Sequence, residues 1–152
     1  MLAKLTTAGY PVVMVITKKI QVGTRGNSEV LDITPQAAEA VAESGVKAGT
    51  ATLFVVGSTA AITTTEYEPG LVNHDIKAAF EKIAPANARY EHEETWHDDN
   101  GHSHVRASLL GPSLVVPIVD GKLTLGTWQQ IVLIEFDTCS RNRLVVCQIA
   151  GE

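Results

Sequence analysis

The segment from Tyr90 to His104 gathers most of the side chains that could do chemistry in this sequence. It holds four of the five histidines, interleaved with aspartates and glutamates. Imidazole nitrogens and carboxylate oxygens are the donors that zinc or manganese takes, provided that they converge on one point. A solvated acidic loop from Glu91 to Asn100 explains the same composition. No paired His-Glu-x-x-His zinc motif is present, so both interpretations stay open.

Spacing favours two of these histidines. In a helix the side chains of His102 and His104 would point about 200° apart, so one of the two is expected to be a spectator. His104 leads into residues 105–111, which can form a short helix, and it is the preferred ligand or proton carrier. If residues 90–94 are extended, His92 faces the same way as its alternate neighbours. His92 is therefore the second candidate.

A second candidate site lies at the start of a predicted helix. Asn73 can act as its N-cap, which places His74 and Asp75 in the first turn beside backbone N–H groups that lack helical partners. Simple capping explains these residues too, and on this evidence alone it is favoured. If the helix start approaches the end of the preceding strand, further polar side chains join the same pocket, namely Ser58, Thr59 and Glu66.

Two pairs of residues nearer the C-terminus are candidate ligand contacts. Arg141 and Arg143 form the closest basic pair and can hold a phosphate, although an interpretation as solvated strand-edge residues has equal weight. Trp128 is expected in the core rather than against a ligand, because large aromatic side chains stabilise mainly by burial. Gln129 offers a donor and an acceptor that orient a substrate or satisfy a neighbouring backbone group.

The amino-acid composition limits the classes of protein to which this chain can belong. The 152 residues are 45% hydrophobic and 19% charged, which predicts one globular domain over residues 1–152. A net charge of −5 gives no reason to expect a nucleic-acid partner. No apolar run approaches the roughly 20 residues of a membrane span. Cys139 and Cys147, without a recognisable leader sequence, indicate a cytoplasmic protein with buried, reduced thiols.

The elements that must position these residues follow from periodicity and from chain breakers. Helices are predicted from Thr34-Pro35 to Gly45 or Gly49, and beyond Pro69 and Gly70, where apolar residues from Val72 to Ile83 follow helical spacing before Pro85. Strands are predicted at 11–22, 50–56 (mostly buried), 114–118 and 122–125 around an Asp120-Gly121 turn, 127–136 and 144–149. Two to three helices among six or more strands, with the strands clustered late, predict an α+β fold with a mostly antiparallel or mixed sheet.

Several blocks of residues resemble the YjbQ-like family. The signature is carried by Gly111-Pro112-Ser113, Pro117 and the run from Gly121 to Gln129. Supporting blocks follow in the right order: Ser58 to Ile62 with Glu66, then Asp75, Tyr90-x-His92, Asn100 with His104, and Arg141-x-Arg143 before Gly151. The resemblance covers most of the chain from about Thr50 onward.

The resemblance implies a homotrimer, with histidines and carboxylates near subunit boundaries that can hold a divalent metal such as zinc, magnesium or manganese. It also implies a thiamine-phosphate synthase activity, which joins a pyrimidine diphosphate to a thiazole phosphate and releases pyrophosphate. A phosphorylated small molecule is then the ligand. The alternative is a non-catalytic trimer that binds a divalent metal or a small ligand.

Roles for individual residues follow from the same resemblance. The catalytic candidates are His92, His104, Glu66 and Asp75; the substrate contacts are Ser58, Thr59, Trp128, Gln129, Arg141 and Arg143; the metal ligands are His74, His92 and His104. One departure matters, because many family members carry histidine where this sequence has Gly57. That removes one possible ligand, which His74 or His102 would have to replace.

Overall fold

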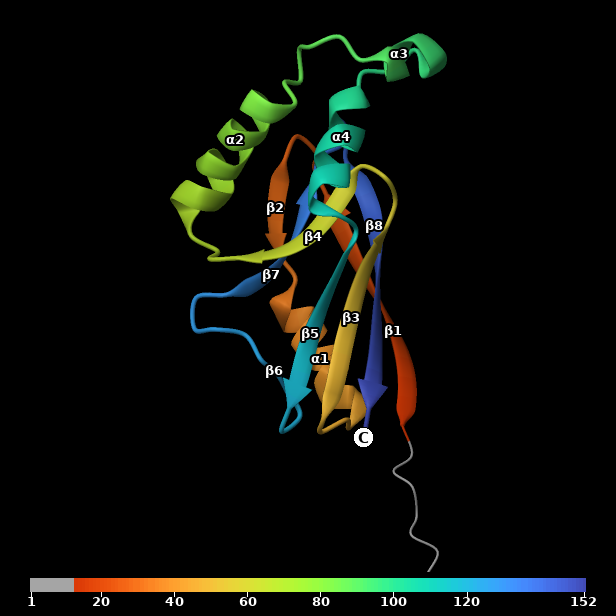
Figure 1. Cartoon of the computed structure of the whole chain (residues 1–152), viewed down its shortest axis with the longest axis vertical. Coiled ribbons are helices and arrows are strands. Elements are labelled where there is room, and N and C mark those ends of the chain that lie inside the picture. Colours follow the sequence, from red (N-terminus) through yellow and green to blue (C-terminus); the bar gives the residue numbers. More distant parts are fainter. Residues whose placement is uncertain (1–12) are drawn as a thin grey trace, which may run out of the picture.

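A computed structural model describes residues 13–152 and shows two antiparallel sheets with helices around them (Figure 1). The larger sheet has the strand order β1 (Met14–Thr24), β8 (Arg141–Gly151), β3 (Gly49–Val56), β5 (Ser113–Val119) and β6 (Lys122–Leu123). The smaller sheet has the order β2 (Glu29–Asp32), β7 (Gln130–Glu135) and β4 (Ala60–Thr65). The α+β class with antiparallel sheets is confirmed.

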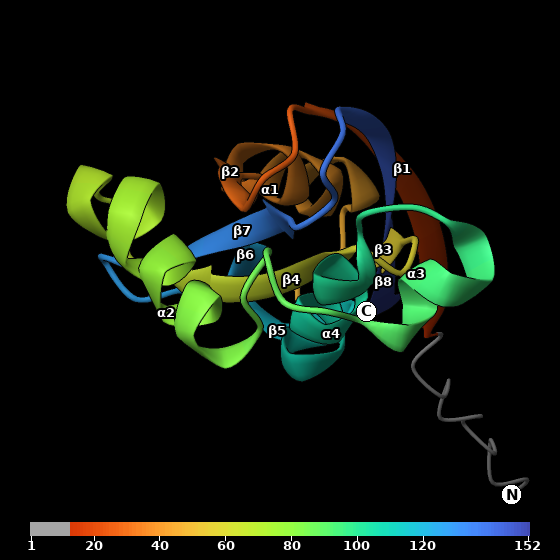
Figure 2. The same ribbon diagram turned by 90° about the horizontal axis from the view of Figure 1, so that it is seen from above.

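Four α-helices accompany the sheets, which is more than the two to three predicted. They are α1 (Thr34–Ser44), α2 (Ile76–Ile83), α3 (Glu91–Trp96) and α4 (Gly101–Leu110), and a π-helical turn, η1 (Leu71–Asp75), leads directly into α2. Figure 2 shows α1 and α4 on opposite sides of β4 and β7. The smaller sheet is thus a middle layer.

The main core lies between the inner face of the five-stranded sheet, α1 and one face of the three-stranded sheet. Strand β3 alternates strictly: Leu53 and Val55 point into this core, whereas Phe54 and Val56 point outward and are exposed. The prediction of a mostly buried strand was therefore wrong for half of its side chains. No helix within residues 13–152 covers the outer face of this sheet, which explains the alternation.

Strand β7 is buried on both faces, because a second core lies on the other side of the small sheet. Leu133 belongs to the main core, while Ile134 and Phe136 pack with residues of α2 and α4. The rings of Phe80 and Phe136 meet edge to face with centroids 4.8 Å apart. A strand covered on both faces needs a continuous apolar run, and residues 131–134 supply it.

Two chain reversals form as their residue types predict. Asp120 and Gly121, between β5 and β6, have φ angles of 52° and 74°, the pair of positive values that a two-residue type I′ turn needs. Helix α1 ends at Gly45 in the left-handed region, with φ 73°, where the absence of a β-carbon lowers the conformational cost.

The predicted N-cap of the second helix, Asn73, was wrong. The backbone N–H groups of Gly70 and Leu71 donate to the carboxylate of Glu68, so the helical segment begins before Asn73. Asn73, His74 and Asp75 lie inside η1 rather than at a helix N-terminus, and their N–H groups are not free for a ligand. The helix ends at Ile83, before Pro85, as predicted.

The predictions about the first strand and the two cysteines are confirmed only in part. The first predicted strand is confirmed from Met14, and its first residues, Pro11 and Val12, lie outside the described residues. Cys147 is buried, but Cys139 is exposed, which corrects the expectation of two buried thiols; both are free cysteines. Across residues 13–152, none of the helices has the length and apolar character needed to cross a bilayer.

Candidate functional site

Four parts of the chain meet at one end of the two sheets. They are the turn from Gly57 to Thr59 between β3 and β4, the segment from Glu135 to Arg143 that joins β7 to β8, and the two helices that carry His92 (α3) and His104 (α4). Figure 1 shows α3 and α4 at this end of the fold. The name His–Arg site is used below for His92, His104, Ser58, Thr59, Glu135, Asp137, Arg141 and Arg143.

A buried ion pair forms the base of this site. Arg143 on β8 donates from Nε and Nη2 to the two carboxylate oxygens of Glu135 on β7, each at 2.6 Å, and Nη2 also donates to Thr59 Oγ1 at 2.6 Å. Glu135 is fully buried and Arg143 is 8% exposed. Bidentate pairing of this kind is charge-assisted and geometrically specific. Arg143 is therefore not the solvated strand-edge residue that the sequence left as an alternative.

A second ion pair extends the network toward the surface. Arg141 Nε donates to Asp137 Oδ2 at 3.0 Å, and the Thr59 hydroxyl donates to the same oxygen at 2.9 Å. Burial raises the pKa of Asp137, but the hydrogen bonds from Arg141 and Thr59 outweigh burial and leave that pKa below its ordinary value. Asp137 is thus held as a carboxylate between the arginine and the hydroxyl.

The two preferred histidines lie together. The ring centroids of His92 and His104 are 4.5 Å apart with a tilt of 50°. His92 Nε2 lies 3.5 Å from Asp98 Oδ1. Burial and the neighbouring His92 lower the pKa of His104, while Asp98, Asp137 and a hydrogen bond with the Ser58 backbone oppose that change. The pair is held between acidic groups and the β3–β4 turn.

His92 reaches this position from a helix, which corrects the expectation of an extended segment at residues 90–94. Helix α3 covers Glu91–Trp96, and three acidic residues in its first turn favour the positive end of the helix dipole. Helix α4 carries His104 on a defined element, as expected. Its other histidine, His102, is buried and points toward Tyr90, with ring centroids 6.2 Å apart. The helical spacing separates the two rings as predicted.

Five of the proposed site residues do not join this group. His74 is exposed and pairs with its neighbour Asp75 at 2.8 Å, and Figure 1 shows η1 at the end of the second helical segment that lies away from α3. Glu66, Trp128 and Gln129 lie at the opposite end of β4 and β7: Ala60 pairs with Glu135, whereas Thr65 pairs with Gln130. Five residues of strand separate these pairs by about 17 Å.

Local structure accounts for two of these residues. The side chain of Gln129 donates to Thr64 Oγ1 at 2.9 Å and accepts from the Gly126 N–H at 3.1 Å, so it satisfies a neighbouring backbone group. Trp128 is 71% exposed, and the expectation that it lies in the core was wrong. A loop between β6 and β7 carries it beyond the reach of either core.

The predicted set of metal ligands is not assembled within one chain. No group of three or more His, Cys, Asp or Glu side chains in residues 13–152 is placed to hold a metal ion. His92 and His104 supply two imidazoles, half of the four ligands that zinc usually takes. The donors of one chain alone therefore do not fit a closed divalent-metal site.

Sequence reasoning missed the carboxylates at the base of the site. Glu135 and Asp137 flank Phe136 at the end of a strand that is otherwise apolar. An acidic residue that continues a buried strand requires a cationic partner. Arg143, eight positions after Glu135, is a candidate for that partner. Thr24 also donates to Glu135 Oε2, at 2.9 Å. The signal that could have revealed these carboxylates is an acidic residue within an otherwise apolar stretch of sequence.

A cavity of about 260 Å³ adjoins the His–Arg site. It is lined by Phe54, Gly57, Ser58, Ala60, Ala107, Ser108 and Pro112. Apart from two hydroxyl groups its walls are apolar. Gly57 and Ser58 belong both to this cavity and to the turn beside His104, so a ligand in the cavity would lie next to the site.

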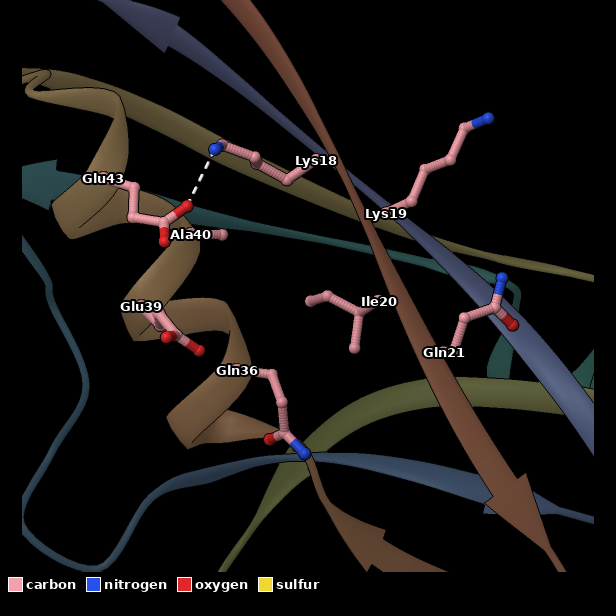
Figure 3. A pocket seen from close by; sticks show the side chains of 8 residues that line it. All are labelled: Lys18, Lys19, Ile20, Gln21, Gln36, Glu39, Ala40 and Glu43. Atoms are coloured by element: carbon pink, nitrogen blue, oxygen red, sulfur yellow. Dashed lines mark hydrogen bonds and ion pairs between the residues drawn. The ribbon is translucent and has the colours of Figure 1, made fainter.

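A separate groove of about 320 Å³ runs between β1 and α1, where the ion pair of Lys18 and Glu43, 2.7 Å long, crosses it (Figure 3). None of the His–Arg site residues lines it. Its walls carry both charge signs on exposed side chains, a composition typical of a solvated boundary between a strand and a helix.

The chain is similar to a set of archaeal and bacterial proteins. Residues 18–152 match the family model described as "UPF0047 protein YjbQ-like". A UPF0047 protein of Methanothermobacter thermautotrophicus is 37% identical over 138 residues, which cover 91% of this chain and 94% of the relative. The UPF0047 protein YugU of Bacillus subtilis is 34% identical over 121 residues, 79% of this chain and 89% of the relative.

Solved structures agree with this similarity. A YbjQ-like protein of unknown function from Sulfolobus solfataricus superposes with a TM-score of 0.87 at 38% identity, covering 93% of this chain and all of the other. A hypothetical protein from Aeropyrum pernix gives a TM-score of 0.82 at 32% identity, with 90% and 99% covered. The chain belongs to the UPF0047, YjbQ-like family.

Proposed function

We propose that this protein binds a phosphorylated small molecule at the His–Arg site and acts on it with the imidazoles of His92 and His104 as proton carriers. The observation that carries the proposal is the 4.5 Å separation of the two rings, beside a buried arginine. An arginine with free donors holds phosphoryl oxygens, and an imidazole gives or takes a proton near neutral pH.

Charge balance decides when an anion would bind. Arg141 and Arg143 are matched by Asp137 and Glu135, so the ion pairs alone carry no net charge. Asp98, whose Oδ1 lies 3.5 Å from His92 Nε2, adds one negative charge beside the pair. A proton on His104 would balance that charge, and a phosphorylated ligand would favour the protonated form.

A thiamine-phosphate synthase-type transfer is the reaction to test first, because the family resemblance points to it. The bond between the pyrimidine methylene carbon and the diphosphate oxygen breaks, and its electron pair leaves with pyrophosphate. The ring nitrogen of the thiazole phosphate supplies the electron pair of the new C–N bond. His104 or His92 in its protonated form would donate a proton to the departing diphosphate, and Arg143 would hold its oxygens.

A homotrimer is part of the same proposal, and the outer face of the five-stranded sheet supports it. The described residues of β1, β8, β3 and β5 that point to this face include one charged side chain, Lys19. The apolar side chains on the face are Val15, Phe54, Val56, Val115, Val119, Leu144 and Val146. Apolar patches of this extent mark association surfaces, and further copies of this chain are the occupants we propose. Association would also let a second copy add ligands to the two imidazoles.

Pyrophosphate release from the purified protein, supplied with both phosphorylated reactants and with magnesium or manganese, tests the proposal. His104→Gln should abolish turnover, whereas His97→Gln removes an exposed imidazole outside the pair and should leave turnover unchanged. A folded, metal-supplied oligomer that releases no pyrophosphate would overturn the transferase and leave the non-catalytic binding protein. Metal analysis of protein without a histidine tag then tests whether the two imidazoles hold a cation.

A further inference from the structure

Gly57 packs its bare α-carbon against the guanidinium of Arg143. It follows β3 with φ 136°, and a β-carbon added there would lie 2.6 Å from Arg143 Nη1 and 3.7 Å from Cζ. Contacts below 3.0 Å do not occur for real β-carbons, so any side chain at this position must displace the guanidinium. The position of Arg143 and the absence of a side chain at residue 57 are therefore linked.

The nitrogen that faces Gly57 is the one that the protein leaves unused. Nε and Nη2 of Arg143 are committed to Glu135 and Thr59, while Nη1 makes no hydrogen bond within residues 13–152. The N–H donors of Nη1 therefore lie beside the β3–β4 turn, where they face Gly57.

We propose that Gly57 is a specificity-determining residue of the His–Arg site: it keeps Arg143 Nη1 accessible to a phosphoryl oxygen of a ligand whose body occupies the adjoining cavity. This inference rests on the proposed function. The guanidinium is already fixed by Glu135 and Thr59, so a ligand would meet a donor that needs no further ordering. A β-carbon at residue 57 would push Nη1 away and disturb the bidentate pair at the same time.

The cavity limits the class of ligand. Its volume of about 260 Å³ is below the usual range for drug-sized ligands, which favours a body no larger than a single small ring. The walls formed by Phe54, Ala60, Ala107 and Pro112 are apolar, and the hydroxyls of Ser58 and Ser108 are the polar side-chain groups of the lining. The expected ligand is a phosphate ester of a small, weakly polar alcohol.

Calorimetric titration of the full chain with inorganic phosphate and with pyrophosphate tests this inference. The wild type should bind, and Gly57→Ala should bind at least about tenfold more weakly, a loss of about 1.4 kcal/mol. Gly45→Ala is the matched control, because Gly45 also has a positive φ, 73°, but an added β-carbon there meets nothing within 4 Å. It should lose stability without losing affinity.

A second measurement needs no substitution at residue 57, in case Gly57→Ala does not fold. In wild-type protein with ¹⁵N-labelled arginine, phosphate should shift the guanidinium signal of Arg143, assigned by its loss in Arg143→Lys. Wild-type protein that binds phosphate while Gly57→Ala binds equally well would overturn the role of Gly57 and leave the proposed function standing. Wild-type protein that binds neither anion and shows no shift would overturn both.

Discussion

Arg143 and Glu135 lie face to face across the boundary between the two sheets, with both N–O distances 2.6 Å. Arg143 belongs to the five-stranded sheet and Glu135 to the three-stranded sheet, so this ion pair ties the layers together at the end where the histidines lie. The same guanidinium holds Thr59 in the β3–β4 turn. The site and the fold thus share one side chain.

Removing one partner of this pair should cost far more than removing both. Arg143→Met leaves the Glu135 carboxylate buried without its cation, and we expect the free energy of unfolding to fall by about 3–5 kcal/mol. The double variant Arg143→Met with Glu135→Leu should recover part of this loss. Urea unfolding of the two single variants and the double variant gives the coupling. Losses that simply add would contradict a direct interaction.

Acid should destabilise the protein through His102. Burial, and next the positive charge of Arg106, lower the pKa of this imidazole in the folded state. The unfolded chain keeps a value of about 6.5, so it takes up the proton first as the pH falls. Above that value neither state is protonated and the effect vanishes. The free energy of unfolding should therefore decrease as the pH drops below about 6.5, down through the folded-state pKa.

Thermal unfolding between pH 7.5 and 5.5 measures this effect. His102→Gln should make the decrease smaller, whereas His97→Gln, which replaces an exposed imidazole, should leave it as in the wild type. His104 contributes in the same direction, because its pKa is also lowered, so part of the decrease should persist in His102→Gln. An identical pH profile for His102→Gln and wild type would contradict the assignment.

Two aromatic side chains should differ sharply in their effect on stability. Phe136 is fully buried and meets Phe80 in the second core, so Phe136→Ala should cost about 3–5 kcal/mol. Trp128 is exposed on its loop, and Trp128→Ala should change the free energy of unfolding by no more than about 0.5 kcal/mol. Denaturant unfolding of both variants at a concentration that keeps the protein monomeric makes the comparison.

The oligomeric state should respond to charge on the outer sheet face. Phe54 and Val115 lie on neighbouring strands of that face and are both exposed. Phe54→Lys or Val115→Lys would bury a charge between copies, and a trimer should dissociate to monomers by sedimentation or light scattering. Gln36→Lys, at an exposed position of α1, which packs on the opposite face of the sheet, is a control with the same added charge. A wild-type protein that is monomeric at micromolar concentration would contradict the proposed homotrimer.

Local signals predicted much of the fold. The Asp120-Gly121 turn depends on the φ range of two adjacent residues and the glycine after α1 on that of one, and the strand patterns depend on alternation along one segment. Helix α3 was missed although Glu91, Glu93 and Glu94 in its first turn are a local signal for a helix start. The exposure of Trp128 had no local signal, because burial depends on what the rest of the chain covers.

The sequence predicted which types of residue form the site better than it predicted which particular residues lie together there. Composition identified the segment that holds His92 and His104, and the helix predicted after residue 104 favoured His104 over His102. His92 was chosen on an expected extended conformation, which was wrong, because α3 carries it. The pairing of Arg143 with Glu135 depends on how β7 and β8 lie in different sheets, which no single segment encodes. Glu66 was grouped with Ser58 because the helix start was expected to approach the end of the strand predicted at 50–56, but β4 (Ala60–Thr65), which was not predicted, separates the two residues.

The position of β7 and β8 in the middle of the sheets has a consequence for protein synthesis. Among residues 13–152, strands β1, β2 and β4 pair only with these two strands, across more than half of the chain for β1 and β2. While the ribosome is still translating the segment before residue 130, three strands have no neighbour to hydrogen-bond with. Such nascent intermediates expose unpaired strand edges and apolar surface. We therefore expect the nascent chain to need chaperones until β7 and β8 have been synthesised.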